Sequence, residues 1–171
     1  QLALYVVSSV SSSNGVGGLL TTNYAYSELK ADMQGRGSLG FASTSATRSI
    51  DAANTQTIVT YYSQSYPYTG RVKQQDVLVT INGTAFQRLV KRTQNSFANT
   101  GALSSPTQTT STRYFPYTSS TAEFNYDYDT GNLISSTTTN YGYTDGWGNP
   151  TSVNVSTTDA ATGTVFTGTT T

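Results

Sequence analysis

The sequence predicts an all-β chain of antiparallel hairpins arranged as a meander. Three observations predict it: short runs of Val, Ile, Thr and Tyr recur, turn-forming residues interrupt them, and helix signals are nearly absent. The one stretch with helical composition, residues 26–33 (YSELKADM), covers only about two turns, and Gly35 and Gly37 follow it at once. A helix of that length is marginal without support from other parts of the chain.

The strongest hairpin signal lies at residues 76–90. The runs DVLVTI and TAFQRLV flank Asn82-Gly83, and a two-residue type I′ turn needs positive φ at both central positions, which Asn-Gly adopts easily. Alternate residues of a strand share a face, and in the first arm Val77, Val79 and Ile81 share one. At least one face of this hairpin should therefore be covered.

Other strands and turns follow the same pattern. Runs with strand composition cover residues 56–63, 111–117, 122–128, 133–141 and 151–157. Turn signals that begin with Asp cover residues 51–54, 129–132, 145–150 and 159–163. Pro116 lacks the N–H that a central strand would use, so we expect it at an edge or a bulge.

The chain has the length of one domain, and we expect one β-rich segment over residues 1–171. Predicted loops at residues 11–20 and 99–109 are its only plausible boundaries. Residues 128–133 and 144–150 share an order of Asx turn, Gly-Asn and new strand, which indicates a weak internal repeat. The first residues lack the pattern of a signal peptide, so we expect a processed chain or a piece of a longer one.

Composition narrows the possible partners. Charged residues make up 11% of the chain, and nine Lys and Arg balance nine Asp and Glu, so no basic surface for nucleic acid or an anionic membrane is expected. No apolar run reaches the roughly 20 residues that span a bilayer. Hydrophobic residues are 35%, so apolar burial must depend on the 13 tyrosines. A Cys-free chain rich in Thr, Ser, Asn, Gly and Tyr is typical of secreted bacterial proteins, which favours an extracellular location.

Catalysis and cofactor binding are not expected. The chain has no His and no Cys, which excludes the usual nucleophile–base pairs and nitrogen or sulfur metal sites. Glu123, Asp127 and Asp129 alternate along one predicted strand and could serve a carboxylate-based glycoside hydrolase, but turn and edge roles are favoured. Asp127, Asp129 and Asn132 could offer oxygens to Ca²⁺, although an Asx turn explains them better. We therefore assign no catalytic, cofactor or metal residue.

Several other signals have structural interpretations. Gly35-Arg36-Gly37 is too short for a phosphate-binding loop and predicts a tight bend, with Arg36 covering an aromatic ring or a carboxylate. Trp147 and the tyrosines could stack on sugars, but aromatic residues in β-rich chains more often pair across strands. Residues 82–84 match a glycosylation sequon that a hairpin turn explains better. A solvated face is expected for the dispersed cations, which are Lys73, Arg88, Lys91, Arg92 and Arg113.

Four segments carry a family resemblance: residues 24–32, 34–41 (QGRGSLGF), 60–70 (TYYSQSYPYTG) and the Tyr-Asp-x-Gly-Asn sequence at 128–132. They resemble segments of the Rhs or YD-repeat family, found in the B and C subunits of insecticidal Tc toxins. The second and third are similar to that family's Gly-Arg-Gly-aromatic-Leu-Gly-Phe and Tyr-x-Gln-x-Phe-Pro segments, in the same order. Ser38 stands where the family has an aromatic residue, and Tyr66 replaces the usual Phe.

The resemblance implies a long β-sheet ribbon that spirals into a hollow shell around a C-terminal toxin. This chain would be an open, curved, non-catalytic part of that wall, held by aromatic stripes, with edges that pair with β-segments of the same or neighbouring chains. The family's self-cleaving segment and toxin are not recognisable in these residues. Two alternatives stay open: a carbohydrate-binding or adhesive β-sandwich, which would close a hydrophobic core, and a glycoside hydrolase, which needs a deep acidic cleft.

Overall fold

A computed structural model describes residues 4–51, 53–81, 84, 86–101, 114–143 and 150–171, and these residues form an all-β fold. Ten strands make one antiparallel sheet in the order β1-β2-β5-β6-β7-β8-β9-β10-β11-β12, and β3 and β4 make a separate hairpin. The strands are β1 (Ser9–Ser13), β2 (Leu19–Ser27), β3 (Lys30–Asp32), β4 (Gly37–Gly40), β5 (Ser43–Ser49), β6 (Thr55–Tyr62), β7 (Val72–Thr80), β8 (Gln87–Gly101), β9 (Tyr114–Tyr126), β10 (Leu133–Gly142), β11 (Ser152–Asp159) and β12 (Val165–Thr170).

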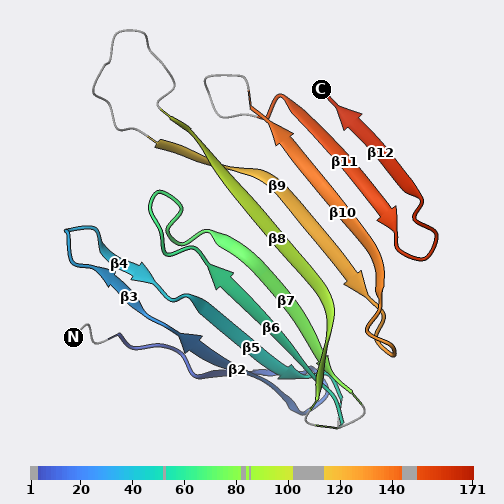
Figure 1. Cartoon of the computed structure of the whole chain (residues 1–171). Helices are drawn as coiled ribbons and strands as arrows, with labels where there is room; N and C mark the ends of the chain where they lie inside the picture. Colours follow the sequence, from blue (N-terminus) through green and yellow to red (C-terminus); the bar gives the residue numbers. More distant parts are fainter. Residues whose placement is uncertain (1–3, 52, 82–83, 85, 102–113, 144–149) are drawn as a thin grey trace.

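The sheet is an open meander, as the sequence predicts. Each strand pairs with the next one along the chain, except that the β3–β4 hairpin is inserted between β2 and β5. Figure 1 shows a twisted, curved ribbon with β1 and β12 at its opposite edges. Strands of this composition form readily because branched Thr and Val side chains fit a pleated surface.

The two ends of the sheet are built differently. At the turn end, short connections join β1 to β2, β5 to β6, β7 to β8, β9 to β10 and β11 to β12. At the loop end, longer connections join β2 to β5, β6 to β7, β8 to β9 and β10 to β11. The connection from β2 to β5 carries the β3–β4 hairpin. Residues 102–113 in the connection from β8 to β9 and residues 144–149 in the connection from β10 to β11 lie outside the described residues.

The one stretch with helical composition forms no helix, as its short length indicates. Residues 26–33 form the end of β2, a bend and β3. Glu28 in the bend has a φ of 53°, a left-handed value that costs free energy in a non-glycine residue. Its carbonyl accepts a 2.7 Å hydrogen bond from the side-chain amide of Gln64, so a contact with a distant segment overrides local helix propensity.

The hairpin at residues 76–90 is confirmed, but its turn is longer than predicted. Thr80 pairs with Gln87, and the Ile81 N–H donates to the Phe86 carbonyl at 3.1 Å. Four residues therefore separate the closing pair, where the Asn-Gly pattern predicts two; residues 82 and 83 themselves lie outside the described residues. The register between β7 and β8 shifts by one residue between Val77 and Leu78, which indicates a β-bulge in this pair of strands.

Other strand limits also differ from the prediction. The predicted runs 111–117 and 122–128 belong to one long strand, β9, although residues 111–113 are not described. Pro116 pairs with β8, but the pairing of β9 with β10 reaches only Ser120, so Pro116 lies at a local edge as expected. The predicted loop at 11–20 shortens to the turn from Asn14 to Gly18, because its two sides belong to β1 and β2.

No hydrophobic residue is buried among the residues that the structure describes. The buried residues there are polar: Thr57, Asp76 and Thr80 are at most 9% exposed. A β-sandwich buries the inner faces of two packed sheets, whereas this chain has one ten-stranded sheet and a short hairpin. The fold therefore matches the open sheet and disagrees with the sandwich alternative.

Candidate functional site

The sheet contains a half-buried ion pair between a buried carboxylate on β7 and a partly exposed guanidinium on β8. Asp76 and Arg92 are directly opposite each other on β7 and β8, and the guanidinium donates to both carboxylate oxygens at 2.8 Å. Gln74 donates to the same carboxylate at 3.0 and 3.1 Å and accepts from Gln94. The hydrogen bonds to Asp76 raise the pKa of Arg92, so the guanidinium stays charged at any ordinary pH.

Threonine hydroxyls extend this polar network toward the turn end. Thr57 on β6 bonds to the hydroxyl of Thr47 at 3.0 Å and accepts from the side-chain amide of Gln87 at 2.9 Å. Thr80 on β7 accepts from the Thr55 N–H and donates to the Thr55 carbonyl. The side chains of Thr57, Asp76 and Thr80 thus all have hydrogen-bond partners, as buried polar groups require.

Polar pairs across neighbouring strands hold the rest of the sheet, and this corrects the expected aromatic stripes. Residues directly opposite each other bond through hydroxyl and amide groups at 2.8–3.1 Å. These pairs are Ser11–Thr21, Thr47–Thr57, Asn95–Thr121, Asn125–Ser135, Thr137–Thr157 and Asn154–Thr169. Cross-strand pairs of this kind each stabilise a sheet by roughly 0.2–1 kcal/mol.

Aromatic contacts gather instead at the loop end. Tyr68 in the connection from β6 to β7 stacks on Phe97 of β8, with ring centroids 5.7 Å apart, and its hydroxyl accepts from Asn99. Tyr117 of β9 contacts Tyr143 at 4.3 Å between centroids. The rings therefore fasten the long connections to the strands rather than one strand to the next.

Gln64 is the central residue of a clamp at the loop end. It lies after β6, and its side-chain amide donates to the carbonyl of Glu28 at 2.7 Å and to that of Gly40 at 2.8 Å. Those carbonyls flank the β3–β4 hairpin, so one side chain fixes both ends of the insertion. The second and third segments of the family resemblance thus meet in space.

Arg36 completes the clamp and confirms its predicted role. Its guanidinium lies 4.2 Å from the ring centroid of Tyr66 and 3.8 Å from the carboxylate of Asp32. Gly35 and Gly37 on either side have φ values of 102° and 77°, which glycine adopts without strain. The Gly-Arg-Gly sequence is therefore a tight turn that places the guanidinium over a ring.

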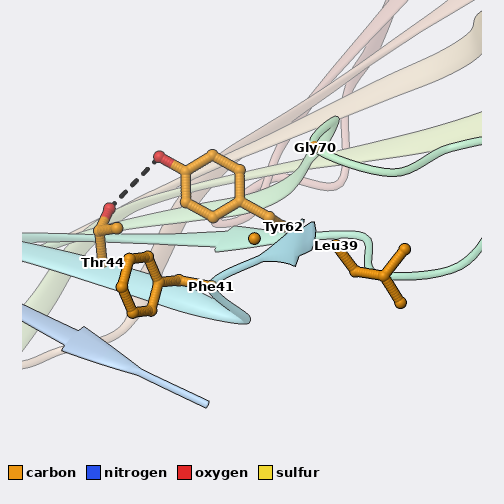
Figure 2. A pocket seen from close by; sticks show the side chains of 6 residues that line it. Leu39, Phe41, Thr44, Tyr62 and Gly70 are labelled. Carbon is orange, nitrogen blue, oxygen red and sulfur yellow. Dashed lines mark hydrogen bonds between the residues drawn. The ribbon is translucent and has the colours of Figure 1, made fainter. Parts of the chain in front are cut away.

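A pocket of about 220 Å³ lies beside the clamp. Its lining is mostly apolar and consists of Leu39, Gly40, Phe41, Thr44, Tyr62 and Gly70. Figure 2 shows the ring of Tyr62 above Phe41, with the Tyr62 hydroxyl bonded to the hydroxyl of Thr44 at 3.3 Å. The pocket holds no pair of titratable groups that could carry out acid–base chemistry.

Two turns at the turn end share the sequence Asp-x-x-Thr-Gly. In residues 127–131 and 159–163 the Asp carboxylate accepts the N–H and the hydroxyl of the Thr at 2.7–3.0 Å. The Gly N–H then donates to the Asp carbonyl at 2.9 Å, with φ of 77° and 69°. Hydrogen bonds lower the pKa of the Asp127 and Asp159 carboxylates, and the bonds from Thr130 and Thr162 make the largest contributions.

This repeat differs from the one that the sequence predicts. The sequence pattern predicts a turn that begins at Asp129, whereas Asp127, two residues earlier, is the acid that accepts the turn's hydrogen bonds. The predicted turn at 51–54 is confirmed, with the Asp51 carboxylate accepting from Ala53 and Asn54. The second half of the predicted repeat, residues 144–149 with Trp147, lies outside the described residues.

The carboxylates considered for catalysis or Ca²⁺ do not share a strand face. Glu123 lies in β9 and pairs with Lys91 at 3.4 Å, whereas Asp127 and Asp129 lie in the turn that follows β9. Asp127 bonds to Thr130, and the backbone of Asn132 closes the turn by accepting from the Asp127 N–H. Within the described residues no group of three acids could hold a metal ion.

The cations are less uniformly solvated than expected. Arg92 joins the half-buried pair with Asp76, and Arg88 donates to the carbonyls of Tyr128 and Asp129, which anchors the neighbouring turn. Lys73 is exposed, and Arg113 lies outside the described residues. The described part of the chain contains no helix that is long and apolar enough to cross a membrane.

Solved structures with a similar fold exist. A crystal structure of TcdB2-TccC3-TEV matches with a TM-score of 0.65 at 10% identity, over 82% of this chain and 9% of that one. Crystal structures of TcdB2-TccC3, with and without the hypervariable C-terminal region, match with TM-scores of 0.55 at 8% identity, over 82% and 11%. No family model and no curated protein matches. The likeness establishes the fold, and the chain spans about a tenth of the length of these structures.

Proposed function

We propose that this chain is a non-catalytic wall segment of a shell-forming Rhs or YD-repeat protein that encloses a secreted bacterial toxin. The observation that carries the proposal is an open ten-stranded sheet with no buried apolar residue in its described part. Independent domains bury one face of a sheet against another layer. A sheet without that layer is suited to be one stretch of a larger curved surface.

The similar structures support this role. The TcdB2-TccC3 chains match most of this chain with about a tenth of their own length, so the same sheet architecture occurs there within a much longer protein. The clamp around Gln64 gives a physical reason for the Gly-Arg-Gly and Tyr-x-Gln-x-Tyr-Pro segments of the resemblance, because it fixes a hairpin to the wall. An extracellular location and the absence of enzymatic activity belong to the same proposal.

Electron microscopy of the longest natural polypeptide that contains this sequence tests the proposal. A hollow particle whose wall is one β-sheet layer thick is the expected result, and a solid globular particle would contradict it. Limited proteolysis before and after mild denaturation adds a functional readout. We expect an enclosed segment to resist protease in the native particle and to become cleavable once the wall opens.

A further inference from the structure

The two faces of the ten-stranded sheet carry different side chains. Directly opposed residues of neighbouring strands share a face, so one row of such pairs defines the first face, which we call the Asp76 face. Asp76 lies opposite Val59 on one side and Arg92 on the other, and Arg92 lies opposite Phe124. The row continues to Ala25, Ser45, Ser136, Thr158 and Val165. Further strands added at either edge of the sheet would leave both faces unchanged.

Charge is distributed unequally between the faces. On the described strands of the Asp76 face the charged residues are Asp76 and Arg92, which neutralise each other through bonds of 2.8 Å. Lys73 lies at the register shift between β6 and β7 and is exposed. The remaining charged residues of the sheet strands lie on the opposite face and are Arg48, Arg88, Lys91, Glu123 and Asp159. Charged side chains stay in water unless they are paired, so the opposite face is suited to bulk solvent.

Burial in the centre of the sheet is greatest on the Asp76 face. The buried residues Thr57, Asp76 and Thr80 all lie on this face, although the described residues form no second sheet that covers it. On the same strand as Asp76, Gln75 belongs to the opposite face and is exposed. Side chains of a single sheet bury one another where the sheet curves toward them, because their tips converge on the concave side. The pattern indicates that the centre of the sheet is concave toward the Asp76 face.

Two connections at the loop end pack against the opposite face. Tyr68, in the connection from β6 to β7, stacks on Phe97 of that face at 5.7 Å between ring centroids. Thr44 and Tyr62 also belong to it, and Phe41, which follows the β3–β4 hairpin, lies beside them (Figure 2). These contacts thicken the wall on the face that carries most of the charged residues.

Small polar side chains cover the Asp76 face on both sides of its centre. They include Ser11, Asn23 and Ser45 in β1, β2 and β5, and Ser136, Thr138 and Asn154 in β10 and β11. The larger apolar residues gather in the centre, where Val59, Leu78, Leu89 and Phe124 are half-buried. Within the described strands this face therefore offers a second polypeptide hydroxyl and amide groups, but no charge that lacks a partner.

We propose that the Asp76 face lines the lumen of the shell and contacts the enclosed polypeptide, whereas the opposite face is the outer surface. This inference rests on the proposed wall function and adds an orientation to it. The lumen lies on the concave side of any closed wall, and charged residues on the outer side keep a particle in solution. A lining without unpaired charge forms no ion pair with the enclosed polypeptide, so a polypeptide of either net charge can be released from it.

Cysteine labelling at two neighbouring residues of β11 tests the orientation, because the chain contains no cysteine. Asn154 lies on the Asp76 face and Val155 on the opposite face, and both are exposed. In the longer natural polypeptide, Val155→Cys should react with a maleimide carried on a polyethylene glycol chain too large to cross the wall. Asn154→Cys should lose this labelling and regain it after mild denaturation, whereas both variants of the 171-residue chain should react. The longer polypeptide without either change gives the background.

A photo-crosslinking amino acid at the same two positions gives a readout that does not depend on permeability. Position 154 should become joined to the enclosed segment, which mass spectrometry of the fragments identifies, and position 155 should not. Labelling of Asn154→Cys in a particle that microscopy shows to be hollow, or cross-links from position 155 alone, would overturn the orientation and leave the wall function standing. A solid particle would reject the wall function itself, so microscopy separates the two failures.

Discussion

Arg92 and Asp76 form a two-pronged ion pair across β7 and β8, and the Asp76 side chain is only 8% exposed. Arg92→Met would leave this carboxylate with Gln74 as its remaining side-chain donor. Removing one partner of such a pair leaves the buried charge of the other without a counter-ion. Because Arg92 is one-third exposed, solvent reduces the effect, and we expect a loss of about 2–3 kcal/mol in the free energy of unfolding. Urea denaturation followed by circular dichroism measures it.

The control for this variant is Lys91→Met, which breaks the ion pair with Glu123. Both side chains of that pair are more than 40% exposed, so its loss should cost no more than about 1 kcal/mol. Equal losses for the two variants would show that burial of Asp76 does not matter.

Gln64→Leu should release the β3–β4 hairpin. The change removes the donors to the carbonyls of Glu28 and Gly40 and leaves both without that partner, at a cost of about 1–3 kcal/mol. Trypsin should then cut faster after Lys30 and Arg36, which mass spectrometry of the fragments would show. Gln75→Leu, which removes an exposed bond to Thr60, should leave those cleavage rates unchanged.

Acid should weaken the turn end. Hydrogen bonds from Asn54, Thr130 and Thr162 hold the pKa values of Asp51, Asp127 and Asp159 below their usual 3.8. A lowered pKa in the folded state adds stability above the unfolded value, and this stability is lost as the pH falls below 3.8 through the folded values. The free energy of unfolding should therefore fall in this range.

The triple variant D51N/D127N/D159N tests the source of that pH dependence. It cannot gain the protons, so its stability should change less steeply below pH 3.8 than that of the parent chain. Urea denaturation at a series of acid pH values gives both slopes. Identical slopes would mean that other carboxylates control the acid response.

Gly163→Ala should destabilise the chain although a methyl group has room there. No atom lies within 4 Å of the added Cβ, but φ is +69°, a region that Ala adopts with difficulty. We expect a cost of about 1 kcal/mol. Gly168→Ala in β12 is the contrast, since its site is equally open without positive φ, and it should be neutral or slightly stabilising in the same denaturation assay.

Local chemistry made part of this fold predictable. Branched residues mark β6 and β10, and the Asp carboxylates at 51 and 159 bond to amides two and three residues away, so sequence pattern alone finds these elements. The bend at Glu28 and the pair Asp76–Arg92 could not be found in this way. Each depends on a partner brought close by strand pairing, at 36 and 16 residues of separation.

Among the described residues, the backbone of each strand in this sheet pairs only with the strands immediately beside it. Such an array behaves like a linear chain of coupled units, in which stability is a sum of nearest-neighbour terms. Opening should begin at the flanks, where β1 and β12 each have one neighbour, and move inward, so amide hydrogen exchange should be slowest in β6 to β8. Each further strand that pairs with an edge strand then protects the strands further inside the sheet from opening. A sheet with more strands is therefore more rigid in its middle.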